Sequence, residues 1–183
     1  MVSGKYKVSG GRSNLICFSK RYFAVGSPKY VEVAETRSKG DTSQFSCEIV
    51  SGAHLTVSDL TREAGGADLG MSPKELLMAS LGSCTVMTIR TVFENSKLFA
   101  LKRRNTSSIP NGGWADSSLD GICVKVQEWG DHPHLPSGLS IDIELKGVLS
   151  AEQKMALVKA SEKCPVKTML TNGVSIDTVL KNG

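Results

Sequence analysis

The sequence predicts an α+β domain, because strand-like runs of antiparallel type are segregated around two main helical segments. A chain of 183 residues has room for one domain of ordinary size, with a core large enough to be stable. Hydrophobic residues make up 40% of the chain and charged residues 22%, which is typical of a globular protein.

The strand-like runs are alternating or β-branched and are bounded by Gly, Ser or Asp. The predicted strands cover residues 29–37, 45–50, 54–58, 121–128, 139–146 and 174–180. Residues 101–118 are rich in turn formers, which predicts a surface loop or insertion. We therefore expect one domain over residues 29–183, interrupted by this insertion.

The most informative segment is the predicted helix over residues 72–97. Ser72 is a candidate N-cap, Pro73 occupies the first helical position, and Glu75 completes a capping box. The fourteen residues 76–89 carry no charge, and apolar residues occupy every face of the helix. Such a helix should be buried all round, either inside a domain or between two subunits.

A second capping box at Ser150 and Gln153 opens an amphipathic helix that we expect to run through Lys163. A short new segment starts at Cys164, with Pro165 suited to the first position of a helix, and ends near residues 172–173.

The first 28 residues form a basic leader. Residues 1–29 hold six of the 22 Lys and Arg side chains and no acidic one, so the remaining chain carries 16 basic and 18 acidic groups. This composition fits an organellar transit peptide, a disordered leader or a cloning remnant. We expect an intracellular protein, mitochondrial if the leader is an address and cytoplasmic otherwise.

Composition argues against several classes of partner. The acidic balance beyond the leader and the 5% aromatic content argue against nucleic-acid binding. Ser, Gly and Thr interrupt the apolar stretches, so we expect no membrane span. The five cysteines are an odd number without zinc-ligand spacing, which predicts a reducing compartment and no metal site; they are Cys17, Cys47, Cys84, Cys123 and Cys164.

Cys84 and Cys164 are the candidate reactive residues, although a buried cysteine is more often a small hydrophobic residue. If Pro165 begins a helix, free backbone N–H groups would point at the Cys164 sulfur and lower its pKa. Cys84 lies in the middle of a helix, where apolar surroundings would raise its pKa. A reactive Cys84 thiolate therefore needs a cation from elsewhere in the fold.

Three segments together resemble the OsmC/Ohr family: GGADLGMSPKELLMASLGSCTVMTIR, EQKMALVKASEKCPVKTML and VSIDTVL. The resemblance covers residues 29–183 apart from the insertion, and the order of the motifs agrees. It implies an OsmC-like fold, in which antiparallel sheets wrap around the long central helices of an intertwined homodimer. It also implies a thiol peroxidase that reduces hydroperoxides, organic ones especially, without a metal or other cofactor.

By motif position, Cys84 would be the peroxidatic cysteine and Cys164 the resolving one. The Cys84 thiolate would become a sulfenic acid, Cys164 would condense with it to a disulfide, and an external dithiol would reduce that disulfide. The alternative is a non-catalytic module that binds a small apolar ligand at the dimer interface, where Cys84 merely lines the cavity.

Family members also use an Arg from the N-terminal strands and a Glu directly after the helix-start Pro. Arg37 is our candidate for the Arg, although a solvated arginine at a strand end fits as well. Lys74 occupies the position of the Glu, and the nearest carboxylate is Glu75. One residue turns a helical side chain by about 100°, and the capping box already explains a Glu at this position.

Overall fold

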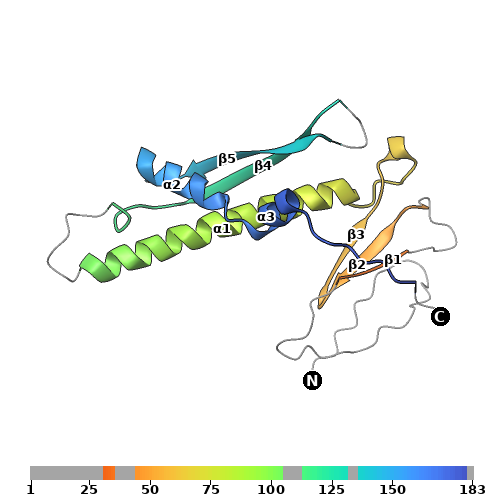
Figure 1. Ribbon diagram of the computed structural model, residues 1–183, viewed down its shortest axis with the longest axis horizontal. Helices are drawn as coiled ribbons and strands as arrows, with labels where there is room; N and C mark the ends of the chain where they lie inside the picture. Colours follow the sequence, from red (N-terminus) through yellow and green to blue (C-terminus); the bar gives the residue numbers. More distant parts are fainter. Residues whose placement is uncertain (1–30, 36–43, 105–112, 132–135, 181–183) are drawn as a thin grey trace, which may run out of the picture. The chain divides into compact units, whose positions relative to one another are not determined.

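The computed structural model describes residues 31–35, 44–104, 113–131 and 136–180 (Figure 1). The described part of the chain divides into two compact units, with the boundary between Leu76 and Leu77. The basic leader and Arg37 lie outside the described residues, so the predictions made for them stay predictions.

The first unit contains a three-stranded antiparallel sheet in the order β1-β2-β3 (Figure 1). The strands are β1 (Glu32–Glu35), β2 (Cys47–Ser51) and β3 (His54–Ser58). Ser51 pairs with His54, so Gly52 and Ala53 form a two-residue turn. Gly52 has φ 61°, a left-handed conformation that glycine adopts without strain, which explains the tight connection.

The loop after β3 is organised by the buried carboxylate of Asp59, which is 1% exposed. Asp59 accepts hydrogen bonds from the backbone N–H groups of Leu60, Ala67 and Leu69, at 2.8, 3.0 and 3.3 Å. A short 3-10 helix, η1 (Arg62–Ala64), lies within this loop. These bonds satisfy loop amides that the sheet does not use.

The long helix α1 spans Pro73–Arg104 and starts at the predicted capping box. The Ser72 backbone N–H donates to Glu75 Oε2 at 2.7 Å, and the Glu75 N–H donates to Ser72 Oγ at 3.4 Å. The helix continues to Arg104, so the prediction that residue 101 begins a loop is wrong by four residues. Residues 101–104 are Leu, Lys and Arg, which are good helix formers and extend the helix.

The second unit places α1 against a two-stranded sheet and two short helices (Figure 1). These elements are β4 (Gly121–Trp129), β5 (Gly138–Lys146), α2 (Ala151–Ser161) and α3 (Pro165–Asn172). The strands pair antiparallel from Gly121 with Lys146 to Trp129 with Gly138. The capping box of α2 forms as predicted, between Ser150 and Gln153.

The core of this unit joins α1, the segment before β4, and α2. Its fully buried members are Ile89, Phe93, Leu119 and Leu157. Two basic side chains on α1 also fasten the segment before β4: Arg90 donates to the Leu119 carbonyl at 2.7 Å, and Lys97 to the Ser117 carbonyl at 2.9 Å. These contacts hold α1 and α2 together, and α3 follows α2 directly.

The C-terminal segment 174–180 is not a strand in this chain. A strand needs a neighbour to satisfy its backbone N–H and C=O groups, and within the described residues no strand pairs with it. Its apolar side chains are exposed, including Ile176 at 83% and Leu180 at 89%. The strand prediction is therefore wrong for a single chain.

Helix α1 is not buried all round within one chain. Met87 is 67% exposed and Phe99 57%, and 28% of the most apolar window of the helix is buried. By length and composition alone α1 could cross a membrane. The expectation that no stretch of the chain is long and apolar enough for a membrane span is therefore wrong. The core helix of a soluble protein can have the same length and composition.

Replacing Leu157 with Ala should lower the free energy of unfolding by about 2–5 kcal/mol, because Leu157 is fully buried beside α1. Met155→Ala is the control on the same helix, since Met155 is 70% exposed. Chemical denaturation measures both variants. Equal losses would contradict the described core.

Candidate active site

The structure brings together two thiols that lie 80 residues apart in the sequence. Cys84 lies in α1, and Cys164 is the N-cap residue of α3. Each thiol is a hydrogen-bond partner of the other, and both are free rather than joined in a disulfide. The two cysteine side chains therefore lie next to one another in the fold.

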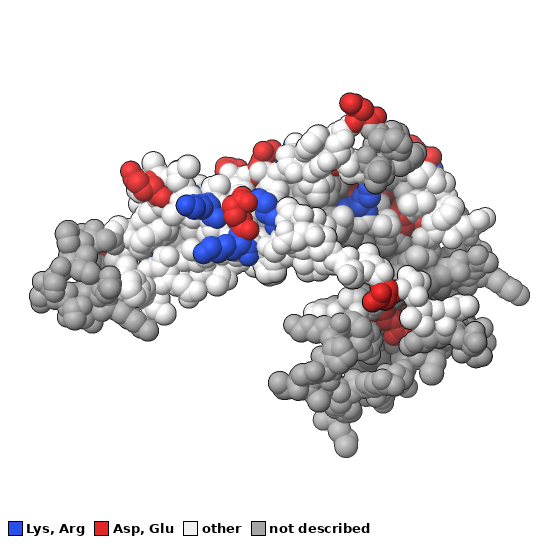
Figure 2. All heavy atoms as spheres, viewed as in Figure 1, with Lys and Arg blue, Asp and Glu red and all other residues white. Residues whose placement is uncertain are grey.

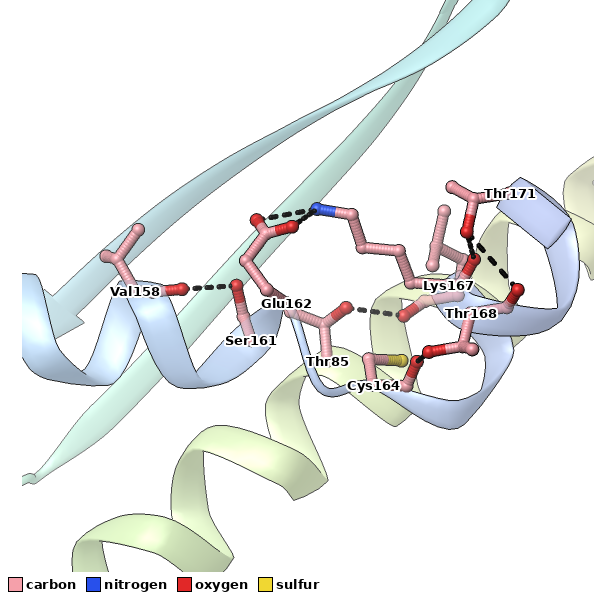
Figure 3. Close-up of polar contacts among 9 residues, drawn as sticks. Thr85, Val158, Ser161, Glu162, Cys164, Lys167, Thr168 and Thr171 are labelled. Carbon is pink, nitrogen blue, oxygen red and sulfur yellow. Dashed lines mark hydrogen bonds and ion pairs between the residues drawn. The ribbon is translucent and has the colours of Figure 1, made fainter.

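The turn between α2 and α3 fixes the position of Cys164. The Cys164 N–H donates to the Ser161 carbonyl at 3.0 Å, which closes the end of α2. Its backbone is extended, and Pro165 then begins α3, as the sequence predicts. The Cys164 carbonyl accepts from the N–H and hydroxyl of Thr168 at 2.9 and 3.1 Å (Figure 3).

Cys164 is fully buried, and its side chain makes no capping hydrogen bond at the start of α3. Burial by itself raises the pKa of the Cys164 thiol, but four neighbouring polar groups that favour the thiolate lower it on balance. They are the Cys84 thiol, the Lys167 N–H, the Thr85 hydroxyl and the Val166 N–H. The start of α3 therefore favours the thiolate form of Cys164, as expected at a helix N-terminus.

Cys84 has the opposite tendency. It is half-buried, and its pKa is raised first by burial and then by its hydrogen bond with Cys164. The Val166 N–H and the Thr88 hydroxyl oppose this shift without cancelling it. Among the described residues of the pair, Cys164 is thus the thiol that ionises more readily.

Lys167 is the basic side chain in the first turn of α3, but its ammonium group is engaged elsewhere. Its Nζ donates to both carboxylate oxygens of Glu162 at 2.6 Å, and Figure 3 shows the side chain extending toward that carboxylate. The residue contributes its backbone N–H to the Cys164 thiol. Figure 2 shows the Lys and Arg side chains in blue and the Asp and Glu side chains in red.

Of the other predicted site residues, Glu75 is described and Arg37 is not. The Glu75 carboxylate accepts from the backbone N–H and hydroxyl of Ser72, both at 2.7 Å. These bonds lower the pKa of Glu75, the hydroxyl having the larger effect. The described contacts of Glu75 thus cap the start of α1. The catalytic role of Glu75 stays a prediction.

Sequence reasoning missed Thr85, which is fully buried beside the two thiols. Its hydroxyl donates to the Leu81 carbonyl at 2.8 Å and is one of the groups that lower the pKa of the Cys164 thiol; Figure 3 shows the two side chains beside one another. The sequence signal was the Thr that directly follows Cys84 in the helix motif. Its partner could not be found from the motif, because Cys164 meets it only through the tertiary fold.

An open groove of about 560 Å³ lies between α1 and β4. Met78, Gly82 and Val86 line it from the helix, and Ile122, Val124 and Val126 from the strand. A helix turns about 100° per residue, so Cys84 lies on the opposite side of α1 from the centre of this row. The groove is therefore separate from the thiol pair.

The structure describes two of the three remaining cysteines. Cys47 lies in β2 and is half-buried, whereas Cys123 lies in β4 and is exposed. Cys17 lies outside the described residues. Within the described ranges, no group of three or more His, Cys, Asp or Glu side chains could hold a metal ion.

A long apolar helix that carries one cysteine, packed beside the start of a helix that carries another, defines a candidate dithiol redox protein of mixed helix and antiparallel sheet. The profile of the OsmC-like protein family matches residues 65–179. The chain belongs to this family.

Solved structures agree with this fold at low sequence identity. An OsmC like protein from Mycoplasma pneumoniae has a TM-score of 0.52 and 13% identity, over 80% of this chain and 89% of that one. A protein from Psychrobacter arcticus, named for an osmotic stress induced and detoxification response, has a TM-score of 0.51 and 19% identity, over 80% and 90%. These likenesses show the fold alone.

A third structure, from Legionella pneumophila, is named an organic hydroperoxide resistance protein OsmC. It has a TM-score of 0.45 and 18% identity, over 79% of this chain and 90% of that one. A search of curated proteins finds no significant match to this chain.

The two thiols should titrate in two separate steps, because each changes the charge felt by the other. In a variant with Cys17, Cys47 and Cys123 replaced by Ser, the thiolate absorbance near 240 nm measures this directly. We expect the first step, which belongs to Cys164, below the ordinary pKa of cysteine. A single step at the ordinary value would contradict the described contact.

Proposed function

We propose that the chain is a cysteine-based hydroperoxide reductase that works as a homodimer. The observation that carries the proposal is the contact between the Cys84 and Cys164 thiols in a member of the OsmC-like family. A disulfide relay needs two sulfur atoms that can meet, and this contact supplies them without a large rearrangement.

In the first step the Cys84 thiolate attacks one oxygen of the hydroperoxide. The O–O bond breaks, the alcohol leaves after taking up a proton, and Cys84 becomes a sulfenic acid. Cys84 suits this role better than Cys164, because it is half-buried whereas Cys164 has no exposed surface.

In the second step the Cys164 thiolate attacks the Cys84 sulfur. The sulfenic oxygen leaves as water after protonation, and a Cys84–Cys164 disulfide forms. The donors at the start of α3 support this step, because they favour the Cys164 thiolate. An external dithiol then reduces the disulfide and is itself oxidised.

The first step also needs a Cys84 thiolate, whose formation its raised pKa disfavours. We propose that the guanidinium of Arg37 supplies the missing positive charge, since it stays charged when buried and offers several donors. Glu75 would act only by orienting that guanidinium.

The homodimer is supported by apolar surface that one chain leaves uncovered. Contiguous exposed apolar patches are typical of interaction surfaces. The exposed apolar side chains of α1 are Leu77, Met87, Leu98, Phe99 and Leu101. The exposed apolar segment 174–180 would gain a strand partner on assembly, which supports exchange of segments between subunits.

Treatment with cumene hydroperoxide should convert the reduced protein to the Cys84–Cys164 disulfide, detected by intact mass and peptide mapping. Cys84→Ser should abolish turnover in the presence of excess dithiol. Cys164→Ser should leave a Cys84 that is oxidised to sulfinic or sulfonic acid, because no thiol resolves the sulfenic acid. Cys123→Ser is the control and should retain activity.

Two outcomes would contradict the proposed reaction. One is retention of both free thiols with no peroxide consumed. The other is a disulfide that joins Cys84 to a different cysteine.

The homodimer predicts a solution mass of twice 19.5 kDa by light scattering. Met87→Asp should shift the protein toward the monomer, because it places a charge on the exposed apolar side of α1. Met155→Asp is the matched control at a similarly exposed methionine on α2. A monomeric wild-type protein would contradict the assembly.

One observation favours a second function, the binding of a small apolar ligand without catalysis. The Cys84 pKa is raised, and the groove between α1 and β4 has a largely apolar lining. The alkylation rate of Cys84 against pH separates the two functions in the assembled protein. A lowered pKa there favours the reductase, and a raised one with no peroxide consumption favours the binding module.

A further inference from the structure

We propose that the external thiol attacks the disulfide at Cys84, and that Cys164 is the leaving sulfur, assisted by the Thr85 hydroxyl. This inference rests on the proposed redox function and specifies how its last step proceeds. It assigns Thr85 a catalytic part, because the Thr85 hydroxyl touches the departing sulfur atom.

Access to the two sulfur atoms is unequal. Cys164 is 0% exposed, whereas Cys84 is half-buried. Thiol–disulfide exchange requires the attacking thiolate to reach the sulfur with which it bonds. A reductant of any size therefore meets Cys84 before it can meet Cys164.

The departing charge is also better accommodated on Cys164. Cys164 directly precedes the first turn of α3, and the Val166 and Lys167 N–H groups of that turn favour its thiolate. Hydrogen bonds to a charged acceptor are roughly twice as strong as neutral ones. The more stabilised thiolate leaves faster. The donors at the start of α3 therefore favour attack at Cys84, as the greater exposure of Cys84 does.

Thr85 adds a side-chain donor from α1 to the backbone donors at the start of α3. Its hydroxyl has a single proton, which is donated to the Leu81 carbonyl when both cysteines are thiols. The same hydroxyl contacts the Cys164 sulfur, so a rotation about one bond can redirect its proton to the sulfur when negative charge develops there. Thr85 is 0% exposed, so solvent does not reach its side chain to take over this role.

The electron and atom balance is that of ordinary exchange. The thiolate of the reductant bonds to Cys84 Sγ, the Cys84–Cys164 bond breaks, and its electron pair stays on Cys164 Sγ. A mixed disulfide then joins the reductant to Cys84. The second thiol of the dithiol attacks the reductant's own sulfur in that bond, which releases Cys84 and completes a two-electron reduction.

The test traps the mixed disulfide with a monothiol, because one molecule of a monothiol supplies only the first of the two exchange steps, and a short exposure limits attack by a second molecule. In the variant that retains only Cys84 and Cys164, diamide forms the disulfide without any peroxide. A short exposure to glutathione is followed by acid quenching, blocking of free thiols with N-ethylmaleimide, and peptide mapping. We expect glutathione on Cys84 and N-ethylmaleimide on Cys164.

The part of Thr85 is tested by the rate at which dithiothreitol reduces the same disulfide. Thr85→Val should slow reduction roughly tenfold, as expected for the loss of one hydrogen bond to a charged sulfur. Thr85→Ser retains the hydroxyl and should restore the rate. Thr171→Val is the matched control, because the Thr171 hydroxyl bonds only to α3 carbonyls in the described contacts.

The outcomes separate this inference from the proposed function. Glutathione on Cys164, or equal amounts on both cysteines, would overturn the direction of attack and leave the reductase proposal standing. An unchanged reduction rate in Thr85→Val would overturn the part of Thr85. Failure of diamide to join Cys84 and Cys164 would overturn both the inference and the reductase.

Discussion

The packing of the α3 N-terminus against the middle of α1 is the constraint on which the candidate site depends. Cys84 and Cys164 are neighbours only because the turn after α2 ends beside α1. The Leu157 side chain on α2 and Ile89 on α1 share one buried core, which maintains this arrangement. This core therefore holds the two helix segments that carry the thiols near one another.

The two cysteines occupy chemically different positions, although both are buried to some degree. Cys84 lies where the backbone N–H groups of its helix are already bonded along the helix axis. Cys164 lies where the first N–H groups of a helix have no intrahelical partner. Burial therefore penalises charge at both sulfur atoms, and only Cys164 receives enough donors to overcome it. This asymmetry supports separate parts for the two sulfurs in the proposed reaction cycle.

Local signals in the sequence predicted the elements but not the surfaces they bury. The capping boxes at Ser72 and Ser150, and Pro165 after Cys164, each act within a few residues, so they fixed three helix starts correctly. Residues 174–180 have a strand pattern but no strand partner within one chain, and that information is not local. Thr85 was missed for the same reason, because its contact with Cys164 spans the whole second half of the chain.

The most direct test of the account is an experimental structure of the reduced protein at a resolution that places both sulfur atoms. The account predicts that the Cα atoms of Cys84 and Cys164 lie within the range that a disulfide can bridge, about 4.4–6.8 Å. It also predicts that the Cys164 sulfur faces the first turn of α3. Cα atoms more than about 7 Å apart, with side chains directed away from one another, would contradict it.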